Sequence, residues 1–339
     1  MDTHAHKTEM RSLDVDPAAI LAVIPTLNEA DHIETCLKSL LEGDPRLKDI
    51  SLIVADGGSS DQTVEIVQRL AAAYPNTRTI NNPGRLQSAA VNLAADAHAT
   101  PGTRWLVRCD AHSIYPPNFI LKVAQALKDT KAASLVVPMD AVGQTCFEKA
   151  NAWIVDTPLG SGGSAHRGGT ASGYVDHGHH AGFELKSFQA LGGYDASFSH
   201  NEDAEYDRRV TLSGRKIYMD ATNRIQYVPR GSVTTLAKQY FRYGRGRAKT
   251  VHKHKMQLKL RQAIPVLALL ASGLGLALSP VFWPAGLVPA GYIAVLAAAS
   301  LFTAIKFRSV CGLLAGPASG TMHMSWAMGF LCETLFARR

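Results

Sequence analysis

Asp110, Ala111 and His112 follow the apolar run 105–109, so a carboxylate and an imidazole stand two residues apart just beyond a predicted strand. Carboxylate oxygens bind hard cations such as Mg²⁺, which keep waters or substrate phosphates as their other ligands. An imidazole nitrogen shifts the preference towards Mn²⁺ or a softer metal. The pair Asp110 and His112 therefore predicts a divalent-metal site able to hold a diphosphate. The alternative is a turn with a surface histidine.

Two further groups suit a phosphorylated or nucleotide ligand. Asp56 ends the apolar run 51–55 and precedes two glycines, so its carboxylate can accept hydrogen bonds from a base or a ribose. The alternative is an acidic turn or helix-cap residue. Arg85 follows Asn82-Pro83-Gly84 and can reach a phosphate, or it can simply start a solvated helix.

Glu202 and Asp203 begin a predicted helix that continues through Tyr206 and Val210. Acidic residues at a helix N-terminus are usually partners of the helix dipole. The sharper interpretation is that Asp203 is a general base at the edge of a cleft, with Glu202 beside it. A hydroxyl nucleophile needs such a proton acceptor within hydrogen-bond reach.

Gln239, Arg242 and Tyr243 open a basic stretch. Arg242 can grip a diphosphate through two parallel hydrogen bonds, and Tyr243 can pack under a sugar ring. The alternative is an amphipathic interfacial helix whose arginine lies among lipid headgroups. His177, His179 and His180 resemble a metal cluster, but no carboxylate stands at a matching spacing, so no second metal site is predicted.

The elements that must position these residues alternate between strands and helices. Apolar runs at 19–24, 51–55, 105–109 and 134–138 predict strands of an α/β domain with a mostly parallel sheet. Ligands of such sheets bind beyond the carboxyl ends of the strands. We therefore expect 25–29, Asp56 and Asp110 to converge. We also expect Asn28 to cap the next helix and Ser59 with Gln62 to form a capping box.

The C-terminal part is apolar. Two charge-free stretches of about 20 residues lie within 263–305, each long enough to cross roughly 30 Å of hydrocarbon. A third run, 310–336, can span, re-enter or lie at the interface, and Arg338 and Arg339 weigh against a full third crossing. A buried helix pair in a soluble protein is the alternative to the membrane prediction. Between Arg224 and Arg261 there are 11 Lys and Arg and no acidic residue, which favours the cytoplasmic side and anionic lipids.

Other features narrow the class of protein. The N-terminus lacks an apolar signal segment, so we expect the catalytic part to stay in the cytoplasm. The net charge of +7 comes without an aromatic and basic RNA-binding motif, so we expect no nucleic acid partner. The cysteines show no paired spacing, and we expect reduced thiols rather than disulfides at positions 36, 109, 146, 311 and 332.

These patterns predict four regions. Residues 1–17 are an N-terminal tail, and 18–223 form the catalytic domain. Residues 224–262 are a basic juxtamembrane segment, and 263–339 are a membrane region of two to three helices. The glycine-rich stretch 160–173 is expected to be a mobile loop.

The order of the motifs resembles that of family two inverting glycosyltransferases with the GT-A fold. Within that family the chain is most similar to succinoglycan-biosynthesis glucosyltransferases of the ExoA type. The resemblance covers about residues 18–260 and includes the short hydrophobic tail. It rests on five motifs and their order: Pro25-Thr-Leu-Asn-Glu29, Asp56-Gly-Gly-Ser-Ser-Asp61, Asp110-Ala-His112, Glu202-Asp203 and Gln239–Tyr243. Asn82-Pro-Gly-Arg85 and Ser88-Ala-Ala-Val-Asn92 carry the closer match.

The resemblance implies a role for each matching position. Asp110 and His112 would bind the metal and the diphosphate, and Asp203 would be the base with Glu202 beside it. His112 stands where many relatives have Asp, and Tyr243 replaces a Trp of processive synthases. The nucleotide sugar would be bound by the remaining motif residues, with Asp56 on the uracil or ribose: Pro25, Thr26, Asn28, Glu29, Asp56, Arg85, Ala111, Gln239, Arg242 and Tyr243.

The resemblance further implies a membrane-anchored enzyme of exopolysaccharide biosynthesis on the cytoplasmic face of the bacterial inner membrane. Its donor would be UDP-glucose, its acceptor a sugar linked to polyprenyl diphosphate, and its cofactor Mn²⁺ or Mg²⁺. Because two or three short spans are too few to enclose a polysaccharide channel, we expect the addition of one or a few sugars. Two alternatives stay open: transfer to polyprenyl phosphate, and a non-catalytic membrane scaffold that keeps the fold.

Overall fold

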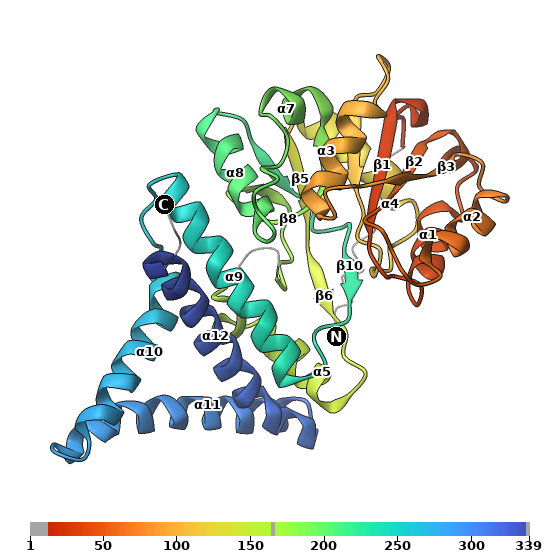
Figure 1. The fold of residues 1–339 in the computed structure, drawn as a ribbon. Coiled ribbons are helices and arrows are strands. Elements are labelled where there is room, and N and C mark those ends of the chain that lie inside the picture. The colour runs from red at the N-terminus through yellow and green to blue at the C-terminus, as the bar shows by residue number, and fades with distance from the viewer. Residues whose placement is uncertain (1–12, 164–166, 337–339) are drawn as a thin grey trace, which may run out of the picture.

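The computed structural model describes residues 13–163 and 167–336. The predictions about a signal peptide and residues 1–12, about the centre of the glycine-rich stretch, and about Arg338 and Arg339 therefore lie outside the described residues. The rest of the chain forms an α/β domain followed by long C-terminal helices (Figure 1).

An eight-stranded sheet organises the described part of the α/β domain, in the order β3-β2-β1-β4-β8-β5-β9-β7. Six strands run in one direction, while β8 and β7 are antiparallel to their neighbours. The sheet is thus mostly parallel, as the sequence predicts. The strands are β1 (Ile20–Thr26), β2 (Ser51–Asp56), β3 (Thr77–Asn81), β4 (Trp105–Arg108), β5 (Ser134–Val137), β7 (Gly173–Val175), β8 (His179–Glu184) and β9 (Ile217–Met219).

Helices cover both faces of this sheet (Figure 1). Along β1, Ile20, Ala22 and Ile24 point to one apolar core and Leu21 and Val23 to the other, and all five are fully buried. A strand buried on both faces reads as a continuous apolar run, which is why β1 and β2 could be recognised in the sequence. The first core packs against α1 (Ile33–Leu41), α2 (Thr63–Ala71) and α4 (Phe119–Thr130), the second against α3 (Gln87–Ala97), α7 (Leu185–Ala190) and α8 (Glu202–Leu212).

Two predicted helix caps are wrong. Helix α1 starts at Ile33 and α2 at Thr63, each several residues later than the caps require. Asn28, at φ +57°, instead bridges two loops: its amide donates to Ser59 Oγ at 2.8 Å and its Oδ1 accepts from the Ser60 amide at 2.8 Å. The side chains of Asn28 and Ser59 therefore hold together the loops that follow β1 and β2. Neither side chain caps a helix.

A smaller parallel pair, β6 (Met139–Ala141) and β10 (Ile225–Tyr227), lies beside the main sheet. Helices α5 (Cys146–Val155) and α6 (Pro158–Ser161) follow β6. Because β10 pairs with β6, the segment predicted to begin at residue 224 starts inside the α/β domain. Short 3-10 helices complete the described part: Pro17–Ala19, Pro45–Asp49, η3 (Trp283–Gly286) and η4 (Val310–Leu314).

Four long helices form the C-terminal part: α9 (Val233–Lys253), α10 (Leu260–Leu278), α11 (Leu287–Lys306) and α12 (Ala315–Phe336). Helices α9 and α12 lie side by side, and α10, α11 and α12 outline a triangle (Figure 1). Glycines permit the close approach of α9 and α12. A Cβ on Gly244 would lie 2.0 Å from the Trp326 carbonyl, and a Cβ on Gly329 would lie 2.0 Å from the Phe241 carbonyl.

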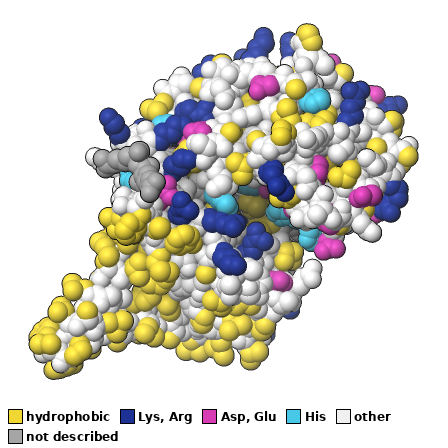
Figure 2. Space-filling view, in the orientation of Figure 1, with side chains coloured by type: hydrophobic (Ala, Val, Ile, Leu, Met, Phe, Trp, Pro, Cys, Tyr) yellow, Lys and Arg dark blue, Asp and Glu magenta, His cyan; other side chains and the backbone are white. Residues whose placement is uncertain are grey.

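Two helical stretches of the described chain are long and apolar enough to cross a membrane, Leu260–Leu278 and Trp283–Lys306. Only 6% and 17% of their apolar windows are buried, so these helices are not core helices of this domain. In Figure 2 their hydrophobic side chains form one continuous lobe, and Lys and Arg side chains gather where the lobe meets the α/β domain. Helix α12, by contrast, is packed against α9, α5 and the other two helices.

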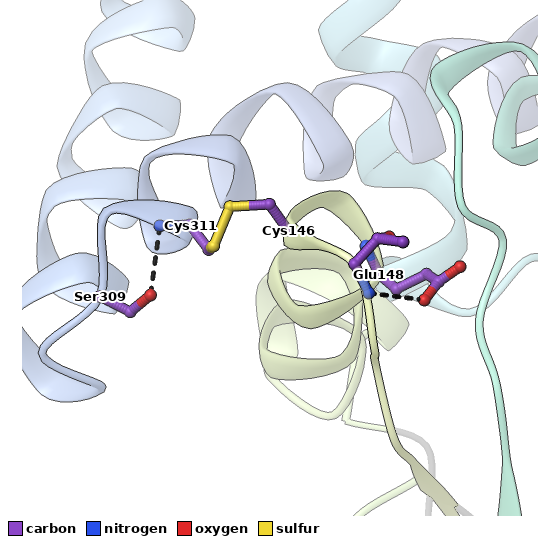
Figure 3. Close-up of a disulfide and its surroundings, with 5 residues drawn as sticks. Cys146, Glu148, Ser309 and Cys311 are labelled. Atoms are coloured by element: carbon purple, nitrogen blue, oxygen red, sulfur yellow. Dashed lines mark hydrogen bonds between the residues drawn. A yellow bond between two sulfur atoms is a disulfide. The ribbon is translucent and has the colours of Figure 1, made fainter.

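The prediction that all five cysteines are reduced is wrong for one pair. Cys146 at the start of α5 and Cys311 in η4 form a disulfide, with Cα atoms 4.9 Å apart (Figure 3). The two residues are 165 positions apart in sequence, so only the packing of α5 against η4 brings them together. Among the described residues Cys36, Cys109 and Cys332 are free thiols.

Candidate active site

A single cavity of about 870 Å³ lies between the carboxyl ends of the central strands and the C-terminal helices. Its first wall contains Pro25 and Thr26 at the end of β1, and Glu29 and Arg85 from the loops after β1 and β3. Ala111 and His112 continue this wall. Its opposite wall comes from α9, α10 and α12. Figure 2 shows the hollow at the boundary between the α/β domain and the apolar lobe.

Asp110 lies at the centre of the first wall, directly after β4. Its Oδ1 accepts hydrogen bonds from Gln87 Nε2 at 2.5 Å and from Arg108 at 3.4 Å. Burial alone would raise the pKa of Asp110, but nearby positive charges, Arg108 foremost, lower it to about 2. The carboxylate is therefore ionised at neutral pH, as a metal ligand must be.

Two imidazoles lie near this carboxylate. His179 Nε2 is 3.5 Å from Asp110 Oδ2, and burial lowers the pKa of His179 to about 4, so its ring is neutral at pH 7. His112 Nδ1 is 3.0 Å from Glu29 Oε1, and that hydrogen bond raises the pKa of His112. His179, at the start of β8, was not among the predicted site residues. Because β8 runs antiparallel to β4, its first residue lies beside the last residues of β4.

Asp56 does not line the cavity. Its Oδ2 accepts from the amides of Gly58 at 2.9 Å and Ser59 at 3.0 Å, and its Oδ1 accepts from Ser59 Oγ at 2.5 Å. Asp56 thus shapes the β2 loop from behind the wall. Asn28 also lies outside the cavity lining, whereas Arg85 lines it and donates to the Gly57 carbonyl at 3.0 Å.

Glu202 and Asp203 both line the cavity at the first turn of α8. Burial holds the pKa of Glu202 above its usual value, although Arg108 lies 3.7 Å away. Burial also raises the pKa of Asp203, but the charges of His177, His180 and Arg108 outweigh it and lower the pKa. At neutral pH Asp203 is therefore a carboxylate that can accept a proton.

A buried hydrogen-bond chain supports these carboxylates from behind. Asp207 lies 2.7 Å from both His177 and His180, and His180 lies 2.6 Å from the Tyr194 hydroxyl. Arg108 donates to that hydroxyl at 3.0 Å. Two of the three histidines therefore bind Asp207, so they belong to a structural network. Among the described residues no cluster of three or more His, Cys, Asp and Glu is arranged to hold a metal ion.

The opposite wall contains Gln239 and Tyr243, whose side chains are joined at 3.1 Å. Arg242 is exposed on α9 and does not line the cavity. Arg247, five residues further along α9, does line the cavity and was not among the predicted site residues. Farther from the sheet the wall becomes apolar, with Ile264 and Pro265 of α10 and Met322 and Trp326 of α12.

The sequence model of glycosyl transferase family 2 matches residues 21–192, which include Asp56, Asp110 and His179. The succinoglycan biosynthesis protein ExoA of Rhizobium meliloti (strain 1021) is 42% identical over 97% of this chain and 99% of its own length. A second relative is 25% identical over 69% of this chain and 74% of its own. It is the dolichyl N-acetyl-alpha-D-glucosaminyl phosphate 3-beta-D-2,3-diacetamido-2,3-dideoxy-beta-D-glucuronosyltransferase of Methanococcus voltae.

Among solved structures, mannosyltransferase PcManGT from Pyrobaculum calidifontis, in complex with GDP-Man and Mn²⁺, has a similar fold. Its TM-score is 0.60, at 19% identity, over 96% of this chain and 89% of that one. The α/β domain therefore has a GT-A-like fold. The family match covers more than half of the chain, and the 42% relative matches nearly all of it. The chain therefore belongs to glycosyltransferase family 2 and is of the ExoA type.

Proposed function

We propose that this glycosyltransferase moves glucose from UDP-glucose, with inversion, to a lipid-linked sugar in exopolysaccharide biosynthesis. One observation carries the proposal: a single cavity joins the ionised groups at the sheet edge to the apolar helices α10 and α12. A water-soluble donor and a lipid-linked acceptor need such a shared chamber. The name of the 42% identical relative, a succinoglycan biosynthesis protein, supports the polysaccharide assignment.

The donor would occupy the half of the cavity at the sheet edge, against Pro25, Thr26 and Glu29, with Asn28 and Asp56 holding the loops behind them. Arg85 supplies a positive charge on this wall. Nucleotides bind beyond the carboxyl ends of parallel strands in α/β sheets, which is where these residues lie. Gln239 and Tyr243 would close the sugar end from α9, while Arg242 would face the surface near the lipid headgroups.

Inverting transfer would require a base for the acceptor hydroxyl and an attack on the anomeric carbon from the side opposite the diphosphate. Asp203 would remove the proton from the acceptor hydroxyl, whose oxygen then bonds to the anomeric carbon of the sugar. The bond from that carbon to the diphosphate oxygen breaks on the opposite side, and UDP leaves. Asp203 is ionised and lines the cavity, so it meets both requirements of a base. Glu202 would hold the Arg108 guanidinium between its own carboxylate and that of Asp110.

A divalent cation, Mn²⁺ or Mg²⁺, fits the donor half of the cavity. Asp110 would hold it, and His112 and His179 are the imidazoles available as further ligands. These three side chains are enough for a cation whose remaining ligands are oxygen atoms of water and of a substrate diphosphate. Such an ion would neutralise charge on the leaving diphosphate.

The apolar lobe would anchor the protein in the bacterial inner membrane, with the α/β domain on the cytoplasmic face. Leu260–Leu278 and Trp283–Lys306 are long enough to cross it, and the basic side chains at the lobe boundary would meet anionic headgroups (Figure 2). The cavity would then open at the headgroup level, where the sugar of a lipid-linked acceptor lies.

The test is a transfer assay with the purified full chain in lipid nanodiscs. Radiolabelled UDP-glucose and a panel of other nucleotide sugars are offered with polyprenyl-diphosphate-linked sugars, with polyprenyl phosphate, or without lipid. We expect metal-dependent labelling of the diphosphate-linked sugar from UDP-glucose. Labelling of polyprenyl phosphate alone would contradict the acceptor assignment, and no turnover of any nucleotide sugar would contradict the enzymatic one.

A further inference from the structure

The cavity has a second cationic end that the donor does not explain. Arg247 of α9 and Arg261 of α10 line it beside Ile264, Pro265, Met322 and Trp326. Positive charge next to an apolar wall is typical of a site for an amphiphile, with an anionic head and a hydrocarbon tail.

Arg247 has no direct ion-pair partner among the described residues, although the carboxylates of Asp203 and Asp207 act on its charge from farther away. No ion pair and no hydrogen bond joins its side chain to another of the described residues. Burial lowers the pKa of Arg247, and Arg261 adds to the lowering while Asp203 and Asp207 oppose it. A partly buried cation without a partner costs stability, and a bound anion would remove this cost.

Contacts between side chains give the order of the groups along the cavity. Arg108 joins Asp110, at 3.4 Å, to Glu202, at 3.7 Å, and Asp203 is the next residue of α8. Just before Glu202, Asn201 donates from Nδ2 to the Tyr243 carbonyl of α9 at 3.1 Å, about one helical turn before Arg247. The start of α8, which carries the base, therefore lies between Asp110 and the α9 wall that contains Arg247. In an inverting transfer the acceptor approaches from the side opposite the leaving diphosphate, which is the Arg247 side.

The neighbouring arginines of α9 do not offer the same site. Arg242 is exposed and outside the cavity lining. Arg245 is paired with Glu333 at 2.8 Å. Arg247 is thus the α9 arginine that combines a place in the cavity wall with a free guanidinium group.

We propose that Arg247, together with Arg261, binds the phosphate groups of the acceptor lipid, and that its hydrocarbon chain leaves along α10 and α12. The occupant is a prenyl chain carrying a phosphate or diphosphate and a sugar. With the head bound at Arg247, the sugar lies towards Asp203 and its hydroxyl meets the base. This inference rests on the proposed function and assigns the acceptor half of the same cavity.

The test compares Arg247→Gln with Lys238→Gln as the control, because Lys238 is an exposed cation of the same helix that does not line the cavity. We expect Arg247→Gln to raise the KM for the lipid-linked acceptor at least about tenfold, the range for losing a charge-assisted hydrogen bond. The affinity for UDP with Mn²⁺, measured by calorimetry, should not change. Arg247→Lys should restore part of the acceptor affinity, and Lys238→Gln should leave both quantities near wild type.

A binding experiment separates the head from the tail and does not depend on turnover. A short-chain prenyl diphosphate, the matching prenyl alcohol and inorganic diphosphate are titrated into wild type and Arg247→Gln. We expect tight binding of the prenyl diphosphate alone, lost in the variant. Weaker UDP binding in Arg247→Gln with an unchanged acceptor KM would overturn the proposal, because Arg247 would then serve the donor. Absence of transfer together with Arg247-dependent lipid binding would count against the enzymatic proposal only.

Discussion

At the scale of single residues, Arg108 is the cation around which the acidic side chains of the cavity are arranged. It is 6% exposed and contacts Asp110, Glu202 and the Tyr194 hydroxyl at 3.4, 3.7 and 3.0 Å. The carboxylates of Asp110, after β4, and of Glu202, in α8, can lie near each other because this guanidinium contacts both. Asp203 follows Glu202 directly, so the same contact sets the position of the proposed base.

Asp203→Asn removes the proposed proton acceptor while keeping size and polarity. We expect the rate of sugar transfer to fall by about 10²–10⁴-fold, the usual contribution of general-base catalysis. UDP affinity should stay within about twofold of wild type, because the proposed base would contact the acceptor hydroxyl and not UDP. Initial rates and calorimetry on the same preparation measure the two effects. Near-normal turnover in this variant would mean that another group takes the proton.

The two imidazoles near Asp110 can be separated by substitution. His179 faces the Asp110 carboxylate, while His112 is held by Glu29. We expect His179→Ala to weaken Mn²⁺ binding about 10–100-fold, measured as free Mn²⁺ by electron paramagnetic resonance in the presence of UDP. His112→Ala should have a smaller effect. A larger effect of His112→Ala than of His179→Ala would instead make His112 the metal ligand, as the resemblance implies.

At the scale of elements, the contact between α9 and α12 places the second wall of the cavity. Gly244 and Gly329 let the backbones touch, so that Tyr243 and Trp326 face the same chamber. The disulfide between α5 and η4 holds the start of α12 against the α/β domain. The wall is therefore held by the close packing of α9 against α12 and by the disulfide just before the first residue of α12.

Gly244→Ala and Gly329→Ala should destabilise the protein by about 1–3 kcal/mol, since the added methyl group overlaps a backbone carbonyl. Their thermal unfolding midpoints in detergent should fall by at least about 2 °C. Gly273→Ala and Gly291→Ala are the controls, because their sites in α10 and α11 have open space within 4 Å. Equal midpoints for all four variants would show that the helices do not touch there.

At the scale of the whole molecule, polar contacts outside the cavity lining join α9 to the α/β domain. Lys253 donates to Asp195 at 2.7 Å and to the buried Glu205 at 2.6 Å. Burial raises the pKa of Asp195, but hydrogen bonds from Lys253 and Ser197 overcome it and lower the pKa to about 2. This ion pair is one of the links through which acid can weaken the attachment of the helices.

The sign of the pH effect follows from that shift. A carboxylate with a folded-state pKa below its unfolded value of about 3.9 stabilises the fold above pH 4, and this contribution is lost as the pH falls towards 2. Because Asp195 is partly solvated, we expect only about 1 kcal/mol. Asp195→Asn should lower the thermal unfolding midpoint at pH 6. Between pH 4 and pH 2, the midpoint of this variant should fall less than that of the wild type. Parallel curves for both proteins would contradict the assignment.

Much of the first wall could be predicted from the sequence because it depends on local patterns. Apolar runs ending at Asp56 and before Asp110 identify the strand ends, and parallel strands bring such ends to one edge of the sheet. His179 could not be found in this way, because its place beside Asp110 depends on the reversed direction of β8. Arg247 and the Cys146–Cys311 pair depend on how distant helices pack, which no short motif encodes.

A cavity with one wall at the sheet edge and the other on apolar helices has a kinetic consequence. The proposed donor would arrive by diffusion in three dimensions, while the proposed lipid acceptor would arrive by diffusion within the plane of a bilayer. The rate should then depend on the mole fraction of acceptor in the membrane and not on its bulk concentration. Adding inert phospholipid at constant total acceptor should slow transfer, although neither the amount of enzyme nor the amount of either substrate has changed.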